Sequence, residues 1–108
     1  MAYNRRKLLL ELDALLLSTP RIRLGEIARI LHVDRHTIEN AMRLTRQVSF
    51  REYRRRELVQ TARTMLNESD VSVKEVGIRL GYKSAASFSR FVQKSTGRSP
   101  SKLRNDGP

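Results

Sequence analysis

The chain has 108 residues, 39% of them hydrophobic, which suits one compact domain or two very small ones and excludes a large enzyme core. Lys and Arg number 22 against 11 acidic residues, and the resulting formal charge of +11 favours a polyanionic partner. The absence of cysteine excludes disulfides, thiol nucleophiles and cysteine-based metal sites, and it fits a reducing cytoplasm.

Hydrophobic periodicity predicts an all-α fold of about seven helices, since no stretch alternates apolar and polar residues long enough for a strand. The first helix is expected over about 4–17 and ends before Pro20, whose ring cannot continue a helix. This leucine-rich run contains Glu11 and Asp13 and is shorter than the roughly 20 apolar residues of a membrane span, so we expect no membrane association. Its inward stripe consists of Leu8, Leu12, Leu15 and Leu16.

A helix, a tight turn and a second helix follow. The first of these covers about 24–31, and Asp34 is the expected N-cap of the second. The segment "VSFRE" predicts the start of a long helix reaching about residue 67, because Ser49 and Glu52 have capping-box spacing.

The second half repeats these signals. Ser72 and Glu75 form another capping box, and the helix after them is followed by "GYKS" and a further helix. Gly97 is expected just past the end of that helix, and Ser99 with Pro100 should open a short last helix.

The two helix pairs can be superimposed in sequence. Up to the turn the offset is 49 residues (73 minus 24), and beyond it 50 (84 minus 34), so the second turn is one residue longer. Apolar positions fall on apolar ones, and the small residue Ala28 falls on Gly77, as a close helix crossing in a helix-turn-helix requires. The paired positions include Leu24 with Val73, Ile27 with Val76, Leu31 with Leu80, Ile38 with Phe88 and Met42 with Val92.

The segment "VGIRLGYKSAASFSRFVQKSTGRSPSKLR" resembles the signature of the AraC/XylS family of bacterial transcription regulators, and the resemblance extends over about residues 22–104. The first half, "LGEIARILHVDRHTIENAMR", is a looser match. It departs from the family pattern at Gln47, where Gly is usual, and at Arg23, where a capping Ser or Thr is expected. The matching residues are Gly77, Gly81, Tyr82, Ser84, Phe88, Arg90, Val92, Lys94, Gly97, Pro100 and Arg104.

The resemblance implies two helix-turn-helix subdomains, 1–48 and 68–108, joined by a helix over 49–67. It also implies sequence-specific binding to double-stranded promoter DNA and regulation of transcription, with the third and sixth helices in the major groove. RNA polymerase is a further implied partner. We expect a monomer for this chain alone, and a dimer is possible if the chain is part of a longer protein.

Projection of the third helix at 100° per residue places Ile38, Ala41, Met42 and Thr45 inward. On the sixth helix, Phe88, Phe91 and Val92 are inward. Asn can pair with adenine, and Ala can touch a thymine methyl group. Arg can reach guanine or a phosphate, Arg90 can alternatively pair with an acid, and Glu39 can accept from cytosine or orient a neighbouring Arg. The expected base readers are His36, Glu39, Asn40 and Arg43 on the third helix, and Ala86, Ser89, Arg90 and Gln93 on the sixth.

Contacts to phosphates are expected from helix N-termini and from hydroxyl or cationic side chains near them. These side chains are Arg35, Ser49, Ser72, Lys74, Lys83, Ser84, Lys94, Arg98 and Arg104. The run Arg54, Arg55 and Arg56 is either a phosphate clamp or a solvated stretch of the joining helix.

Other functions have less support. The sequence lacks paired carboxylates, a Gly-rich phosphate loop and an HExxH-like spacing, so we expect no catalytic residue, no cofactor and no enzyme activity. His32 and His36 are four residues apart, but the turn between them argues against a metal site. The alternative function is a basic protein-interaction module that binds RNA polymerase or an acidic protein, with DNA binding secondary.

Overall fold

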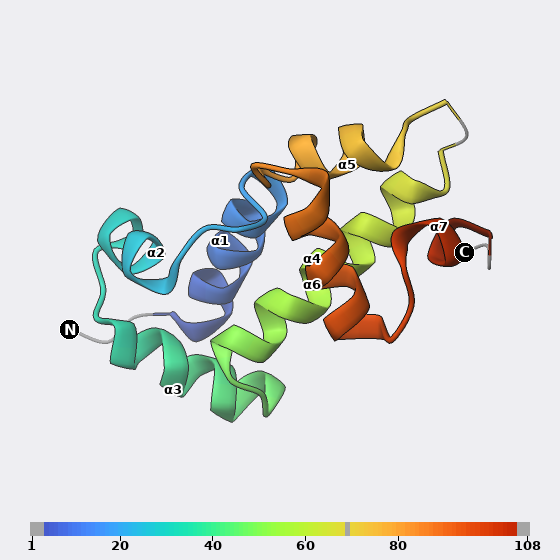
Figure 1. The fold of residues 1–108 in the computed structure, drawn as a ribbon. Coiled ribbons are helices and arrows are strands. Elements are labelled where there is room, and N and C mark those ends of the chain that lie inside the picture. Colours follow the sequence, from blue (N-terminus) through green and yellow to red (C-terminus); the bar gives the residue numbers. More distant parts are fainter. Residues whose placement is uncertain (1–3, 69, 106–108) are drawn as a thin grey trace. The chain divides into compact units, whose positions relative to one another are not determined.

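The computed structural model describes residues 4–68 and 70–105, and within them the chain forms seven α-helices and no strand (Figure 1). The predicted fold class is confirmed. The helices are α1 (Arg5–Ser18), α2 (Leu24–Leu31), α3 (Arg35–Arg46), α4 (Phe50–Leu66), α5 (Val73–Arg79), α6 (Ala85–Thr96) and α7 (Pro100–Asn105).

The chain divides into two compact units, Met1–Arg54 and Arg55–Pro108. The first unit holds α1, α2, α3 and the start of α4, and the second holds the rest of α4 with α5, α6 and α7. The helix α4 therefore contributes to two cores, since Phe50 is buried in the first and Leu58 in the second. The division into 1–48, 49–67 and 68–108 stays a prediction.

The core of the first unit lies between α1, α2 and α3, with Leu12, Ile27 and Ile38 fully buried. Leu9 is also buried, although the stripe predicted for α1 did not include it. The prediction that Thr45 points inward is wrong, because Thr45 is exposed. Arg46 is the partly buried residue of that last turn, and it turns toward α1 because its ion-pair partner Asp13 lies there.

The core of the second unit forms around Phe88, which is fully buried on α6. Tyr82, in the turn after α5, places its ring 5.4 Å from that of Phe88 and 5.8 Å from that of Phe91. A Cβ atom added at Gly77 would lie 2.9 Å from Cβ of Phe88. The crossing of α5 and α6 therefore requires glycine at this position, as the sequence repeat predicted for a small residue.

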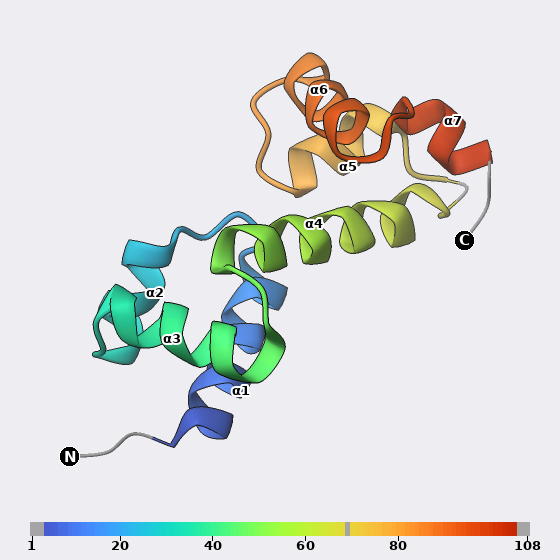
Figure 2. The same cartoon turned by 90° about the horizontal axis from the view of Figure 1, so that it is seen from below.

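Both helix-turn-helix turns have the same backbone hydrogen bond at corresponding positions. In the first, the N–H of Val33 donates to the carbonyl of Ala28 at 3.0 Å, and in the second Tyr82 donates to Gly77 at 2.9 Å. His32 and Gly81, 49 residues apart, both have positive φ. Figure 2 shows the short connection from α2 to α3 and the corresponding one from α5 to α6.

Serine hydroxyls cap the starts of four helices. Ser49 accepts from the N–H of Glu52 at 3.1 Å, Ser72 from Glu75 at 3.0 Å, Ser84 from Ser87 at 3.1 Å and Ser99 from Lys102 at 3.3 Å. Side-chain acceptors of this kind satisfy amides that have no partner within the helix. Asp34 lies at the predicted N-cap position of α3, but its exposed carboxylate makes no capping bond there.

Replacing Gln47 with glycine should raise the free energy of unfolding by about 0.5–1 kcal/mol. Gln47 follows α3 with a φ of 58°, in the left-handed region that a residue with a Cβ occupies at a cost, whereas the matching residue after α6 is Gly97, with a φ of 77°. Urea unfolding measures the difference. Gln60→Gly, at an exposed position within α4, is the control and should destabilise the protein by about 1 kcal/mol. An unchanged or lower stability for Gln47→Gly would contradict the argument.

Candidate nucleic-acid interface

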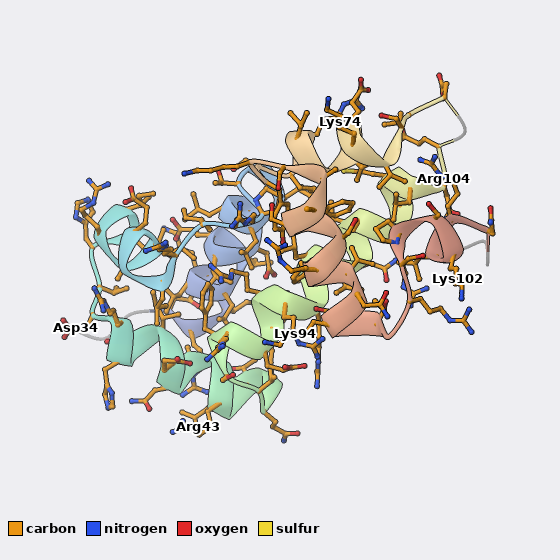
Figure 3. The ribbon with its side chains drawn as sticks, in the orientation of Figure 1. Asp34, Arg43, Lys74, Lys94, Lys102 and Arg104 are labelled. Atoms are coloured by element: carbon orange, nitrogen blue, oxygen red, sulfur yellow. The ribbon has the colours of Figure 1, made fainter. Side chains whose placement is uncertain are left out.

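The outer face of α3 carries three of the four predicted readers of the first unit. His36, Asn40 and Arg43 are exposed at positions i, i+4 and i+7, which one face of a helix shares. Figure 3 shows the Arg43 side chain extending away from the ribbon of α3. The opposite face is fixed in the core by the buried residues Ile38, Ala41 and Met42.

Glu39 lies differently from its three neighbours. Its side chain is half-buried, and its Oε1 accepts a hydrogen bond of 3.0 Å from the backbone N–H of Phe50, the first residue of α4. The carboxylate therefore lies at the start of α4.

The outer face of α6 carries the predicted readers of the second unit. Ala86, Arg90 and Gln93 are exposed and Ser89 is half-buried, while Phe88 and Val92 face the core. Gln93 donates from its amide nitrogen to the carbonyl of Gly97 at 3.2 Å, which occupies one of its donors at the end of the helix. Ala86 and Arg90 are four residues apart and share the outer face.

A charged cluster ties the last turn of α3 to α1 and α4. The guanidinium of Arg46 donates two hydrogen bonds to the carboxylate of Asp13, at 2.8 and 2.7 Å, and the hydroxyl of Tyr53 donates to the same carboxylate at 2.8 Å. Arg46 also lies 4.6 Å from the centre of the Tyr53 ring. Burial raises the pKa of Asp13, but the bonds from Arg46 and Tyr53 and the charge of Arg46 lower it by more, so the pKa lies below 3.8.

The predicted phosphate-binding side chains fall into three groups. Arg35, Lys74, Lys83, Lys94 and Arg98 are exposed. The hydroxyls of Ser49, Ser72 and Ser84 accept helix amides as described above. Arg104 is half-buried, and its guanidinium donates to the carbonyls of Leu66 and Val71, so this side chain links α7 to the end of α4.

Arg54 has a structural contact that neither interpretation of the arginine run included. Its guanidinium donates to the carbonyl of Ile22 at 2.9 Å and to that of Arg21 at 3.3 Å, and so holds the connection between α1 and α2 against α4. This contact has no signal in the sequence, because its acceptors are backbone carbonyls more than 30 residues away.

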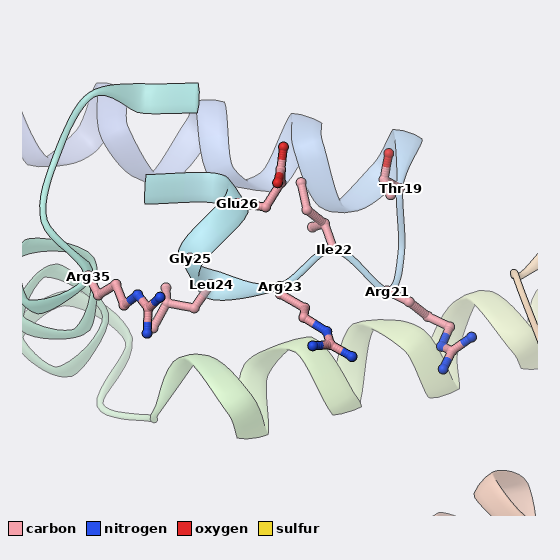
Figure 4. A pocket seen from close by; sticks show the side chains of 8 residues that line it. All are labelled: Thr19, Arg21, Ile22, Arg23, Leu24, Gly25, Glu26 and Arg35. Carbon is pink, nitrogen blue, oxygen red and sulfur yellow. The ribbon is translucent and has the colours of Figure 1, made fainter. Parts of the chain in front are cut away.

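An open pocket of about 730 Å³ lies at the start of α2 (Figure 4). Arg21, Arg23 and Arg35 line it, and the Arg35 side chain reaches the first turn of α2, where a Cβ at Gly25 would lie 2.8 Å from its guanidinium. Arg23 occupies the N-cap position of α2 and makes no side-chain capping bond. Arginine side chains thus gather at the positive end of a helix dipole, an arrangement that attracts anions.

Residues 27–106 match a family model described as a helix-turn-helix domain. The chain belongs to the AraC-type helix-turn-helix family. This membership confirms the resemblance predicted from sequence, and it makes the chain a DNA-binding domain of a family that is not an enzyme family.

Two curated bacterial proteins are similar to this AraC-type domain, and both are called uncharacterized HTH-type transcriptional regulators. YtdP of Bacillus subtilis (strain 168) is 32% identical over 81 residues, which are 75% of this chain and 10% of that protein. YijO of Escherichia coli (strain K12) is 30% identical over 78 residues, 72% of this chain and 28% of that protein. The chain therefore spans about a tenth of the length of YtdP and just over a quarter of the length of YijO.

Solved structures share the fold of this AraC-type domain. The C-terminal domain of the response regulator AraT from Geobacillus stearothermophilus is 20% identical, with a TM-score of 0.78, over 94% of this chain and 84% of that one. An AraC-type regulator from Chromobacterium violaceum is 20% identical, with a TM-score of 0.75, over 94% of this chain and 92% of that one. The DNA-binding domain of AdpA, solved with a target DNA, is 21% identical, with a TM-score of 0.74, over 97% of this chain and 93% of that one.

Two other features are absent from residues 4–68 and 70–105. None of the helices in this part of the chain is long and apolar enough to span a membrane. Among the same residues, His, Asp and Glu side chains form no group of three that could hold a metal ion.

Proposed function

We propose that this chain recognises a specific sequence in double-stranded DNA through α3 and α6, and that the protein to which it belongs regulates transcription at a promoter. The observation that carries this proposal is the repeated pair of helices in which a tight turn presents a second helix with a buried back and a polar, exposed front. A helix of this kind fits the major groove.

The proposed base contacts follow from the exposed side chains. Asn40 would pair with adenine, Arg43 and Arg90 with guanine, and Ala86 would leave room beside Arg90 for a thymine methyl group. His36, Ser89 and Gln93 complete the proposed reading set. Cationic side chains flank these residues, and the net charge of +11 supports binding to a polyanion.

Phosphate contacts are proposed from the exposed cations on the helix-turn-helix units and from the pocket at the start of α2. Arg35 was expected to contact phosphate from the sequence, and we add Arg23, which lines the same pocket. Arg104 is left out of the proposed set because its guanidinium binds two carbonyls within the second unit. RNA polymerase is a proposed second partner, and a monomer is the proposed state of this chain alone.

The substitutions Asn40→Ala and Arg90→Ala should each relax the base preference at one position of the bound sequence. A bidentate contact contributes about 1–3 kcal/mol of discrimination, which corresponds to roughly ten- to a hundredfold. Selection from a random duplex library, followed by titration of the selected and a scrambled duplex at several salt concentrations, measures both the motif and the affinity.

Arg6→Ala is the matched control, because Arg6 is an exposed arginine of α1 outside both reading faces. It should keep the wild-type motif. The wild-type protein should bind the selected duplex far more tightly than the scrambled one, with an affinity that falls steeply with salt. A library that yields no motif, with equal and weak binding to both duplexes, would instead favour the basic protein-interaction module.

A further inference from the structure

We propose that Glu39 is a positioning residue that joins the reading helix α3 to the start of α4, and that it does not read a base. The proposal rests on the DNA-binding function proposed above and changes its reading set. It leaves His36, Asn40 and Arg43 as the readers of the first unit.

The contact of Glu39 satisfies an amide that the fold would otherwise leave without an acceptor. The first N–H groups of a helix have no partner within the helix. In α4 the hydroxyl of Ser49 accepts from Glu52, and the carboxylate of Glu39 accepts from Phe50 at 3.0 Å. The Phe50 residue is only 4% exposed, so removal of this acceptor would leave a buried donor, which costs more than an exposed one.

The charge of Glu39 also suits this place better than the groove. A carboxylate at a helix N-terminus is stabilised by the helix dipole. In the groove the same carboxylate would face the negative potential of the phosphates unless it met a cytosine amino group.

The internal repeat explains why only the first unit needs this glutamate. At the offset of 50 residues, Glu39 corresponds to Ser89 and Phe50 corresponds to Pro100. Pro100 opens α7 and has no N–H group, so the start of this helix has no donor for the side chain at 89 to satisfy. Ser89 therefore has no counterpart of the Phe50 amide from which to accept a hydrogen bond.

The proposal predicts different results for three substitutions at neighbouring positions of α3. Glu39→Ala should lower the affinity for every duplex by about threefold, as loss of one helix-capping bond implies, and leave the selected motif unchanged. Glu39→Gln should restore the affinity, because its amide oxygen can accept from Phe50. Asn40→Ala, at the next residue of α3, is the control that should alter the motif.

Hydrogen exchange at single amides distinguishes positioning from a general loss of stability. In Glu39→Ala the Phe50 amide should exchange at least threefold faster than in the wild type, and in Glu39→Gln it should not. The Glu52 amide, which Ser49 caps, should keep its wild-type rate in both variants.

Two results would overturn the proposal: a Glu39→Ala motif that loses preference at one base position, or a Phe50 amide with an unchanged exchange rate. If the wild-type protein selects no motif, the DNA-binding proposal fails instead. The exchange rates then still decide whether Glu39 holds the start of α4.

Discussion

Replacing Gly77 with valine is expected to lower the free energy of unfolding by about 3 kcal/mol, through overpacking of the second unit. A Cβ atom at this position would lie 2.9 Å from Cβ and 3.0 Å from Cγ of Phe88. Phe88 is fully buried and forms the centre of its core, so it cannot move aside without disturbing Tyr82 and Val92. Chemical denaturation monitored by circular dichroism measures the loss.

Gly25→Val is the matched control in the first unit. The three atoms nearest to a Cβ atom at Gly25 all belong to the guanidinium end of Arg35, an exposed side chain whose flexible end can shift at low cost. We expect a change within about 0.5 kcal/mol. Equal losses for the two valine variants would show that the crossing of α5 and α6 tolerates a side chain and that the Gly77 argument is wrong.

Asp13→Ala is expected to lower the free energy of unfolding by about 2 kcal/mol. The substitution removes the acceptor of two hydrogen bonds from Arg46 and one from Tyr53, and it removes the carboxylate that pairs with a partly buried guanidinium. Thermal or urea unfolding at pH 7 gives the difference. Glu11→Ala, two residues earlier on the exposed side of α1, is the control and should change the stability by less than about 0.5 kcal/mol.

The contribution of Asp13 should also depend on pH in a defined direction. The pKa of Asp13 is lower in the folded protein than its ordinary value of 3.8, because the bonds from Arg46 and Tyr53 outweigh the effect of burial. A group of this kind stabilises the fold fully above its unfolded pKa and loses that contribution as the pH falls through the folded pKa. The difference between wild type and Asp13→Asn should therefore be constant at neutral pH and shrink below pH 3.8. A difference that grows with acid would contradict the assignment.

Local signals accounted for the helix starts and turns. Serine hydroxyls accept the expected amides at Ser49, Ser72 and Ser99, because capping involves residues only three apart in the chain. The repeat likewise predicted a small residue at Gly77. The exposed outer faces of α3 and α6 followed from periodicity, since the rotation per residue fixes which side chains share a face.

Contacts between elements far apart in the sequence give some predicted site residues partners within the fold. Glu39 and Arg104 were expected to contact DNA; in the structure Glu39 accepts from the first amide of α4, and Arg104 donates to the carbonyls of Leu66 and Val71. Thr45 was placed inward by the same helical projection that placed its neighbours correctly. In the last turn of α3 it is Arg46, paired with Asp13 on α1, that is partly buried, and Thr45 is exposed.

The sequence by itself determined the helices, their order, the two helix-turn-helix units and the family, because each depends on spacing within about 20 residues or on a repeat of that pattern. Only the tertiary structure decided which polar side chains have hydrogen-bond partners on other elements. That outcome depends on whether a donor or acceptor more than ten residues away lies within hydrogen-bond distance, as Phe50 does for Glu39 and Asp13 for Arg46.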